Sequence, residues 1–95
     1  MIMTRQAFLV TSGIDGQMLE FWLEQQWLIP QDGPDGPAFS DGDVARAHFI
    51  LDLKRDFGVN DEGVGLVLHL VDQLHGMRRA FALLKNEMSA GRSDL

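Results

Sequence analysis

Apolar residues in the last third of the chain recur at alternating steps of three and four positions. They are Val67, Leu70, Leu74, Met77, Phe81, Leu84 and Met88. This is a heptad pattern with positions a and d filled, and it predicts one long helix over residues 60–88. Asn60 is the expected N-cap of this helix. The polar residues 89–95 are expected to form a frayed tail.

We call these seven apolar residues the seam, and a seam of this length needs a partner helix. The short helices expected upstream are too small to cover it, and the simplest cover is a second copy of the chain. We therefore predict that the seam is the interface of a homodimer. The alternative is that it packs wholly inside the monomer. The pattern leaves open whether the paired helices run parallel or antiparallel.

Glycine and capping signals divide residues 5–30 into two helices. The first is predicted over residues 5–11, because Gly13 can adopt the left-handed conformation that ends a helix. Asp15 is a good N-cap for the second helix. That helix carries Trp22 on its apolar face and is expected to continue until Pro30 stops it.

Residues 31–38 contain two Gly-Pro steps. Proline lacks a backbone N–H, so the segment is expected to form neither a helix nor a central strand. We predict a loop whose flanking residues, 28–29 and 38–39, pair briefly as a two-stranded wing.

Ser40 begins the third predicted helix. Asp43 stands three residues later, which resembles a capping box in which Asp replaces the commoner Glu. Asp41 and Asp43 also suit the positive end of the helix dipole. Gly58 is the residue expected to close this helix.

Length and composition favour a single folded domain over residues 1–95, with a winged-helix-like part at 5–57. The chain is 45% hydrophobic, which is too apolar for a disordered protein. It has no cysteine, so disulfides and thiolate metal sites are excluded. No apolar run is long enough to span a bilayer, and the first residues do not resemble a signal peptide. We expect a cytoplasmic protein; any association with the nucleoid would come through a partner.

Negative charge dominates the first part of the chain. The net charge is −6, and residues 1–40 contain one basic residue, Arg5. The acids in the same segment are Asp15, Glu20, Glu24, Asp32 and Asp35. This surface is expected to repel a polyanion and attract a basic partner, although acidic charge also serves solubility.

Catalytic and metal-binding patterns are weak. His69 and His75 are six positions apart on the predicted long helix, which places them well apart around its axis, and Asp72 between them does not complete a cluster. The serines lie at helix ends or in the tail, where capping explains them. We predict no enzymatic activity, no metal and no cofactor.

Several segments resemble the MerR-type winged-helix family. They are residues 19–30 (LEFWLEQQWLIP), 39–44 (FSDGDV), 49–53 (FILDL) and 57–59 (FGV). The resemblance implies a mainly α fold: a winged helix-turn-helix with a short two-stranded wing and a long C-terminal dimerisation helix. It also implies binding to DNA as a dimer, which we keep as the alternative function.

The departures from that family affect its DNA-reading elements. MerR-type regulators carry an arginine at the position of Glu20 and basic residues in the wing. Here the wing has Asp32 and Asp35 and no base. DNA binding requires the neutralisation of several phosphates, so these changes disfavour it.

A related bacterial family with a changed surface is the CbpM-type chaperone modulators, which this chain resembles in length and at residues 64–74 (VGLVLHLVDQL). The resemblance implies a protein partner, the J-domain of a DnaJ-like (CbpA-type) co-chaperone. An acidic modulator would occupy the basic helix of that J-domain and inhibit it. A third interpretation is a dimerisation module that scaffolds some other protein.

The candidate partner-binding residues are acidic side chains and one tryptophan. They are Glu20, Glu24, Trp27, Asp32, Asp35, Asp41, Asp43, Asp61 and Glu62. For the four acids near helix starts, at positions 41, 43, 61 and 62, stabilisation of the helix dipole is the competing explanation. Trp27 is equally suited to an interface or to the core.

Overall fold

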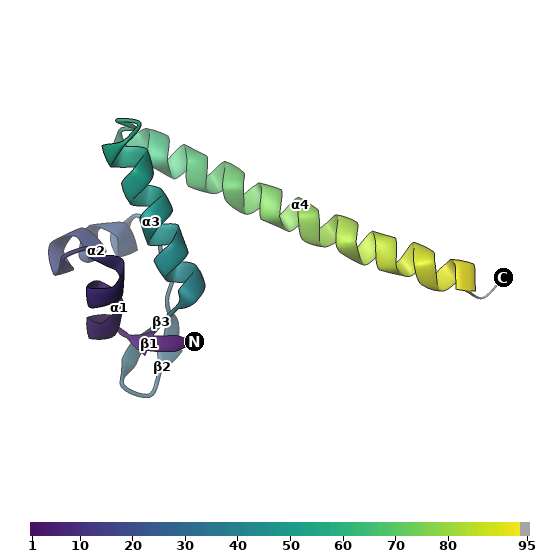
Figure 1. Ribbon diagram of the computed structural model, residues 1–95, viewed down its shortest axis with the longest axis horizontal. Helices are drawn as coiled ribbons and strands as arrows, with labels where there is room; N and C mark the ends of the chain where they lie inside the picture. Colours follow the sequence, from purple (N-terminus) through teal and green to yellow (C-terminus); the bar gives the residue numbers. More distant parts are fainter. Residues whose placement is uncertain (94–95) are drawn as a thin grey trace. The chain divides into compact units, whose positions relative to one another are not determined.

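The computed structural model describes the backbone of residues 1–93 and the side chains of residues 1–89. It confirms a mainly helical fold with a small wing (Figure 1). The elements in chain order are β1 (Ile2–Thr4), α1 (Arg5–Ser12), α2 (Gly16–Glu24), β2 (Gln31–Gly33), β3 (Gly36–Ser40), α3 (Asp41–Arg55) and α4 (Asp61–Ser93). The chain forms two compact units, Met1–Gly65 and the part that begins at Leu66, and each is described by itself.

The predicted roles of Gly13 at the end of α1 and of Asp15 as the N-cap of α2 are confirmed. Gly13 has φ 80° and its N–H donates to the Leu9 carbonyl at 3.0 Å, which ends α1. The Asp15 carboxylate accepts a hydrogen bond from the Met18 N–H at 2.8 Å and so caps α2.

The predicted end of α2 is wrong: the helix stops at Glu24, well before Pro30. Gln26 adopts a left-handed conformation with φ 61°, which is uncommon for a residue other than glycine. The chain turns there, and the Trp27 N–H donates back to the Trp22 carbonyl at 3.0 Å. The turn carries Trp27 and Leu28 into the core, and their burial offsets the cost of the unusual backbone.

The wing also differs from the prediction. Residues 28–29 do not pair with 38–39; instead β2 and β3 form a hairpin within residues 31–40, in which Gln31 pairs with Ala38 and Gly33 with Gly36. Strand β1 was not predicted and pairs antiparallel with β3, giving a three-stranded sheet in the order β1-β3-β2.

Pro37 lies in β3, the central strand of the sheet, although we had expected this proline-containing segment to form no central strand. Its place in the register explains why it is tolerated. Strand β1 reaches only as far as the Thr4–Ala38 pair, so β3 has a single neighbour, β2, at Pro37. A proline can occupy such a position because one side of the strand lacks a hydrogen-bonding neighbour.

The capping box predicted for α3 is present. The Asp43 N–H donates to the Ser40 hydroxyl at 3.2 Å, and the Ser40 N–H donates to the Asp43 carboxylate at 2.9 Å. The left-handed residue after the helix is Gly58, with φ 64°. It allows the Val59 N–H to reach the Leu53 carbonyl at 2.9 Å.

The core of the first unit joins its helices to its sheet. The Phe8 ring of α1 stacks on the Phe39 ring of β3, with ring centroids 4.3 Å apart. Arg46 of α3 donates from Nε to the Trp27 carbonyl at 2.5 Å, which fastens the segment after α2 to α3. Other fully buried side chains are Leu19, Trp22, Leu28, Ile50 and Val64.

Helix α4 begins as predicted and ends later. The Asn60 side chain accepts from the Gly63 N–H at 2.8 Å. The helix continues through residues 89–93, where we had expected a frayed tail. Residues 94–95 of that tail lie outside the described residues.

Candidate functional site

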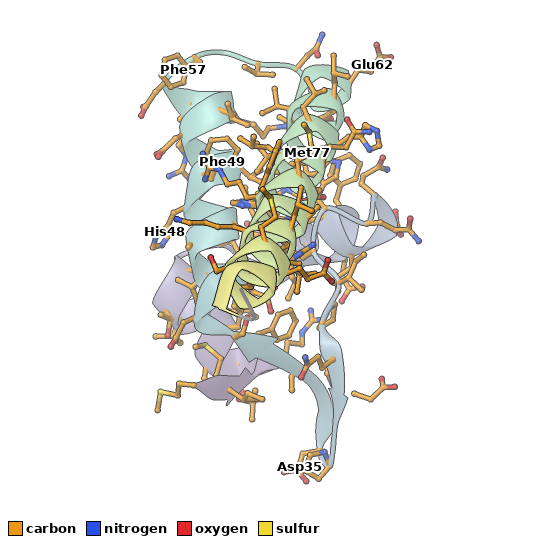
Figure 2. All side chains as sticks on the ribbon, turned by 90° about the vertical axis from the view of Figure 1, so that its right-hand side faces the viewer. Asp35, His48, Phe49, Phe57, Glu62 and Met77 are labelled. Carbon is orange, nitrogen blue, oxygen red and sulfur yellow. The ribbon has the colours of Figure 1, made fainter. Side chains whose placement is uncertain are left out.

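The acids of α2 and of the hairpin are all exposed. We call Glu20, Glu24, Asp32 and Asp35 the α2–wing acids. Asp35 lies at the tip of the hairpin (Figure 2). Residues 13–45, which contain α2 and both hairpin strands, have no lysine or arginine. These elements therefore carry only negative charge of their own.

Glu20 differs from the other α2–wing acids because it has a partner. Arg5, at the start of α1, donates from Nη1 to the Glu20 carboxylate, and the two side chains are 40% and 58% exposed. Within the described part of the chain, Glu24, Asp32 and Asp35 form no ion pair. Their charge is available to a binding partner.

Three of the four acids near helix starts are engaged locally. Asp43 belongs to the capping box, and Asp41 lies 3.2 Å from the N-terminal ammonium group. Asp61 accepts a hydrogen bond from Lys54. Glu62 lies in the first turn of α4, so all four positions fit helix-start stabilisation (Figure 2).

Trp27 must be corrected as a candidate anchor, because it is only 5% exposed. Its ring packs edge-on against the Phe21 ring, with centroids 5.6 Å apart, and its centroid lies 6.2 Å from that of the Trp22 ring. Lys54 Nζ stands 5.8 Å from the ring centroid. The early end of α2, which the sequence did not reveal, turns this side chain inward. The apolar residue left outside is Ile29, which is 73% exposed and was not singled out from the sequence.

The seam on α4 is exposed in the single chain. Phe81 is 66% exposed, and the least exposed residue between Leu70 and Met88 of the seam, Leu74, is still 45% exposed. Only Val67 is half-buried. The pairing of two copies through the seam stays a prediction. Shallow hollows run along this helix, one of about 160 Å³ among Met77, Ala80, Phe81 and Leu84.

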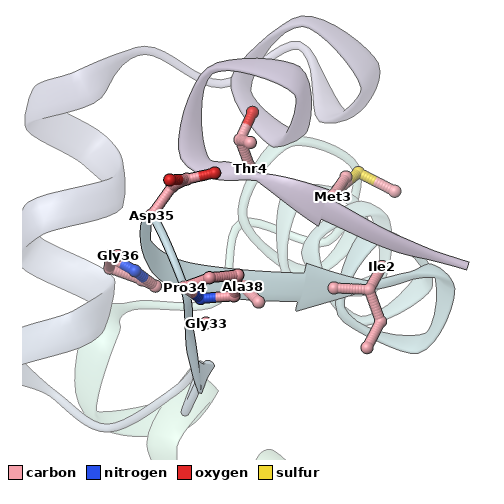
Figure 3. Close-up of a pocket in the computed structure, with 9 residues that line it drawn as sticks. Ile2, Met3, Thr4, Gly33, Pro34, Asp35, Gly36 and Ala38 are labelled. Carbon is pink, nitrogen blue, oxygen red and sulfur yellow. The ribbon is translucent and has the colours of Figure 1, made fainter.

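The first unit is hollowed near its sheet and near the end of α3. One hollow, of about 180 Å³, is bordered by β1 and the hairpin turn, and Figure 3 shows the Asp35 carboxylate turned toward Thr4 there. Another, of about 550 Å³, lies among α2, the end of α3 and the first residue of α4.

Among the residues that the structure describes, no three His, Asp or Glu side chains are grouped so that they could hold a metal ion. Over the same residues, no helix has the length and apolar character needed to cross a membrane.

Comparison with known protein families gives a match over most of the chain. A family model described as MerR HTH family regulatory protein matches residues 3–86, which is most of the chain from β1 to the seam. No curated protein matches.

Proposed function

We propose that this chain, which belongs to the MerR helix-turn-helix family of regulatory proteins, acts on another protein: it binds and inhibits the J-domain of a DnaJ-like, CbpA-type co-chaperone. The observation that carries this proposal is the charge of α2 and the hairpin. The resemblance assigns DNA reading to these elements, and here they contain acids and no base.

Phosphate contacts dominate the affinity of proteins for DNA, and they come mainly from Lys and Arg. Of the bases beside α2, Arg5 is paired with Glu20 and Lys54 is paired with Asp61. Glu24, Asp32 and Asp35 would each repel a phosphate. This surface suits a basic partner instead.

A J-domain with a basic helix fits such a surface. Opposite potentials accelerate encounter and select the partner, while buried apolar contacts supply most of the affinity. Ile29, exposed between α2 and β2, is the best-placed apolar anchor. It takes the role that we had considered for Trp27.

We propose further that two copies pair through the seam. Its exposed Leu, Met and Phe side chains follow the a and d positions of a coiled coil, and a second copy presents the same stripe. Pairing would place two J-domain sites in one assembly.

The test is a calorimetric titration of the full chain with the J-domain of the co-chaperone from the same organism, at low and at high salt. Saturable binding that weakens with salt is expected. The double variant Asp32→Asn/Asp35→Asn should weaken binding at low salt by roughly threefold to tenfold, as expected for exposed charges.

The matched control is Asp52→Asn/Asp56→Asn, which removes the same charge from exposed positions at the end of α3. It should bind like the unmodified chain. No binding at either salt by a folded chain would contradict the proposal.

Membership of the MerR family favours a second candidate, a DNA-binding regulator. Fluorescence anisotropy with a labelled duplex separates the two. Affinity that falls steeply with salt would support DNA binding. Binding to neither duplex nor J-domain would leave a dimerisation module with another protein partner.

A further inference from the structure

The 550 Å³ hollow of the first unit has the size of a small-molecule site, for which about 300–1,000 Å³ is typical. It is lined by Met18, Phe21, Trp22, Leu51, Lys54, Arg55 and Asp61. The mechanism proposed above uses none of these side chains. We propose that this hollow binds a small amphipathic monoanion, a carboxylate with an apolar body.

The apolar part of the lining comes from α2 and α3. Trp22 is 1% exposed and forms a fixed wall, while Met18 and Leu51 are half-buried. Phe21 is 37% exposed at the opening. A hydrocarbon or aryl group placed here would remove apolar surface from water on both sides.

The polar part of the lining contains two cations and one anion. Lys54 is held in place, because it donates to Asp61 and lies 5.8 Å from the Trp27 ring centroid. The Arg55 guanidinium forms no hydrogen bond or ion pair within the described residues. The hollow thus offers one uncompensated positive charge, which matches a ligand with one negative charge.

Arginine suits a carboxylate in particular, since its planar guanidinium can donate two parallel hydrogen bonds to the two oxygens. Lys54 and Arg55 lie in the last turn of α3, where the helix dipole favours positive charge, and this explains why both residues are basic. The dipole does not account for the apolar hollow beside them.

The rest of the protein argues against larger anions. Its net charge is −6, so a polyanion such as a nucleic acid or an anionic membrane surface would be repelled before it reached the hollow. A small monoanion suffers much less of this repulsion. The ligand is therefore a molecule on the scale of a medium-chain fatty acid or an aryl carboxylate.

The experiment is an NMR titration of the ¹⁵N-labelled full chain with sodium octanoate, and in parallel with octylammonium chloride, which has the same chain and the opposite charge. Octanoate should cause saturable shifts at the Trp22 indole N–H and at the amides of residues 51–55. Octylammonium should not. Equal shifts with both probes would overturn the proposal, as would octanoate shifts confined to residues 66–89.

Three variants test how individual charged side chains contribute to octanoate binding. Arg55→Gln should weaken octanoate binding about tenfold, the usual scale for one charge-assisted hydrogen bond. Asp61→Asn should strengthen it, because it frees Lys54. Arg79→Gln, an exposed position on α4 that does not line the hollow, is the matched control and should bind normally. Unchanged affinity in Arg55→Gln would refute the role of the guanidinium.

Discussion

Replacing Phe81 by alanine tests the seam as a dimer interface most directly. The side chain is 66% exposed in the single chain. Complete burial of a phenylalanine stabilises by about 1.5–3 kcal/mol, so covering the exposed two-thirds contributes about 1–2 kcal/mol in each protomer. Since a symmetric dimer loses the contact in both copies, Phe81→Ala should cost about 2–4 kcal/mol of association free energy. That corresponds to a dissociation constant raised roughly 30- to 1,000-fold.

The assay is sedimentation equilibrium over a series of protein concentrations. Alanine is the best helix former, so α4 should stay helical by circular dichroism and any change should reflect association. Leu83→Ala is the matched control, because Leu83 is 65% exposed but lies off the heptad stripe. Equal dissociation constants for the two variants would refute the reasoning, as would an unmodified chain that is monomeric at every concentration.

Other predictions concern stability, measured by urea or thermal unfolding of the full chain. Phe39→Ala should cost about 3–5 kcal/mol, because it removes a buried ring stacked on Phe8; a loss below 1 kcal/mol would contradict this. Ser40→Ala should cost about 1 kcal/mol by removing the capping box, an effect that Ser40→Asp should largely spare. Glycine substitutions should differ in sign: Gly58→Ala strains a left-handed backbone and destabilises by about 1 kcal/mol. A Cβ added at Gly76 would meet no atom within 4 Å, so Gly76→Ala should stabilise α4 by up to about 1 kcal/mol. Equal changes in stability for Gly58→Ala and Gly76→Ala would contradict this reasoning.

Local signals predicted helix boundaries well wherever a side chain or a glycine acts on its near neighbours. Asp15, Ser40 and Asn60 cap helices through bonds to residues three positions away, and Gly13 ends α1. The heptad stripe likewise predicted α4, because its period depends on the helix alone.

Features that depend on distant contacts were missed. Strand β1 exists because residues 2–4 pair with residues 38–40, and nothing local in its sequence indicates that partner. The end of α2 lies at a left-handed glutamine, for which glycine-based rules give no signal. That misjudged turn also hid the burial of Trp27 and the exposure of Ile29.

The sequence predicted the charge of the candidate site better than its geometry. The acids of α2 and the hairpin are evident from composition, and the structure leaves them exposed. The sequence did not show which of these acids form ion pairs. Only the fold brings Arg5 to Glu20 and leaves the Arg55 guanidinium beside an apolar hollow, with no ion pair among the described residues.

The Arg5–Glu20 pair has a consequence for how such a surface can change during evolution. If the proposed function holds, a change toward a DNA-reading helix would begin with Glu20→Arg, the residue that the MerR-type pattern has there. In this chain that single mutation would set two guanidinium groups against each other, because Arg5 already faces the position. The first mutational step would therefore carry a penalty that only a second mutation, at Arg5, removes. Epistasis between these two positions would make such a change of binding class harder than one codon suggests.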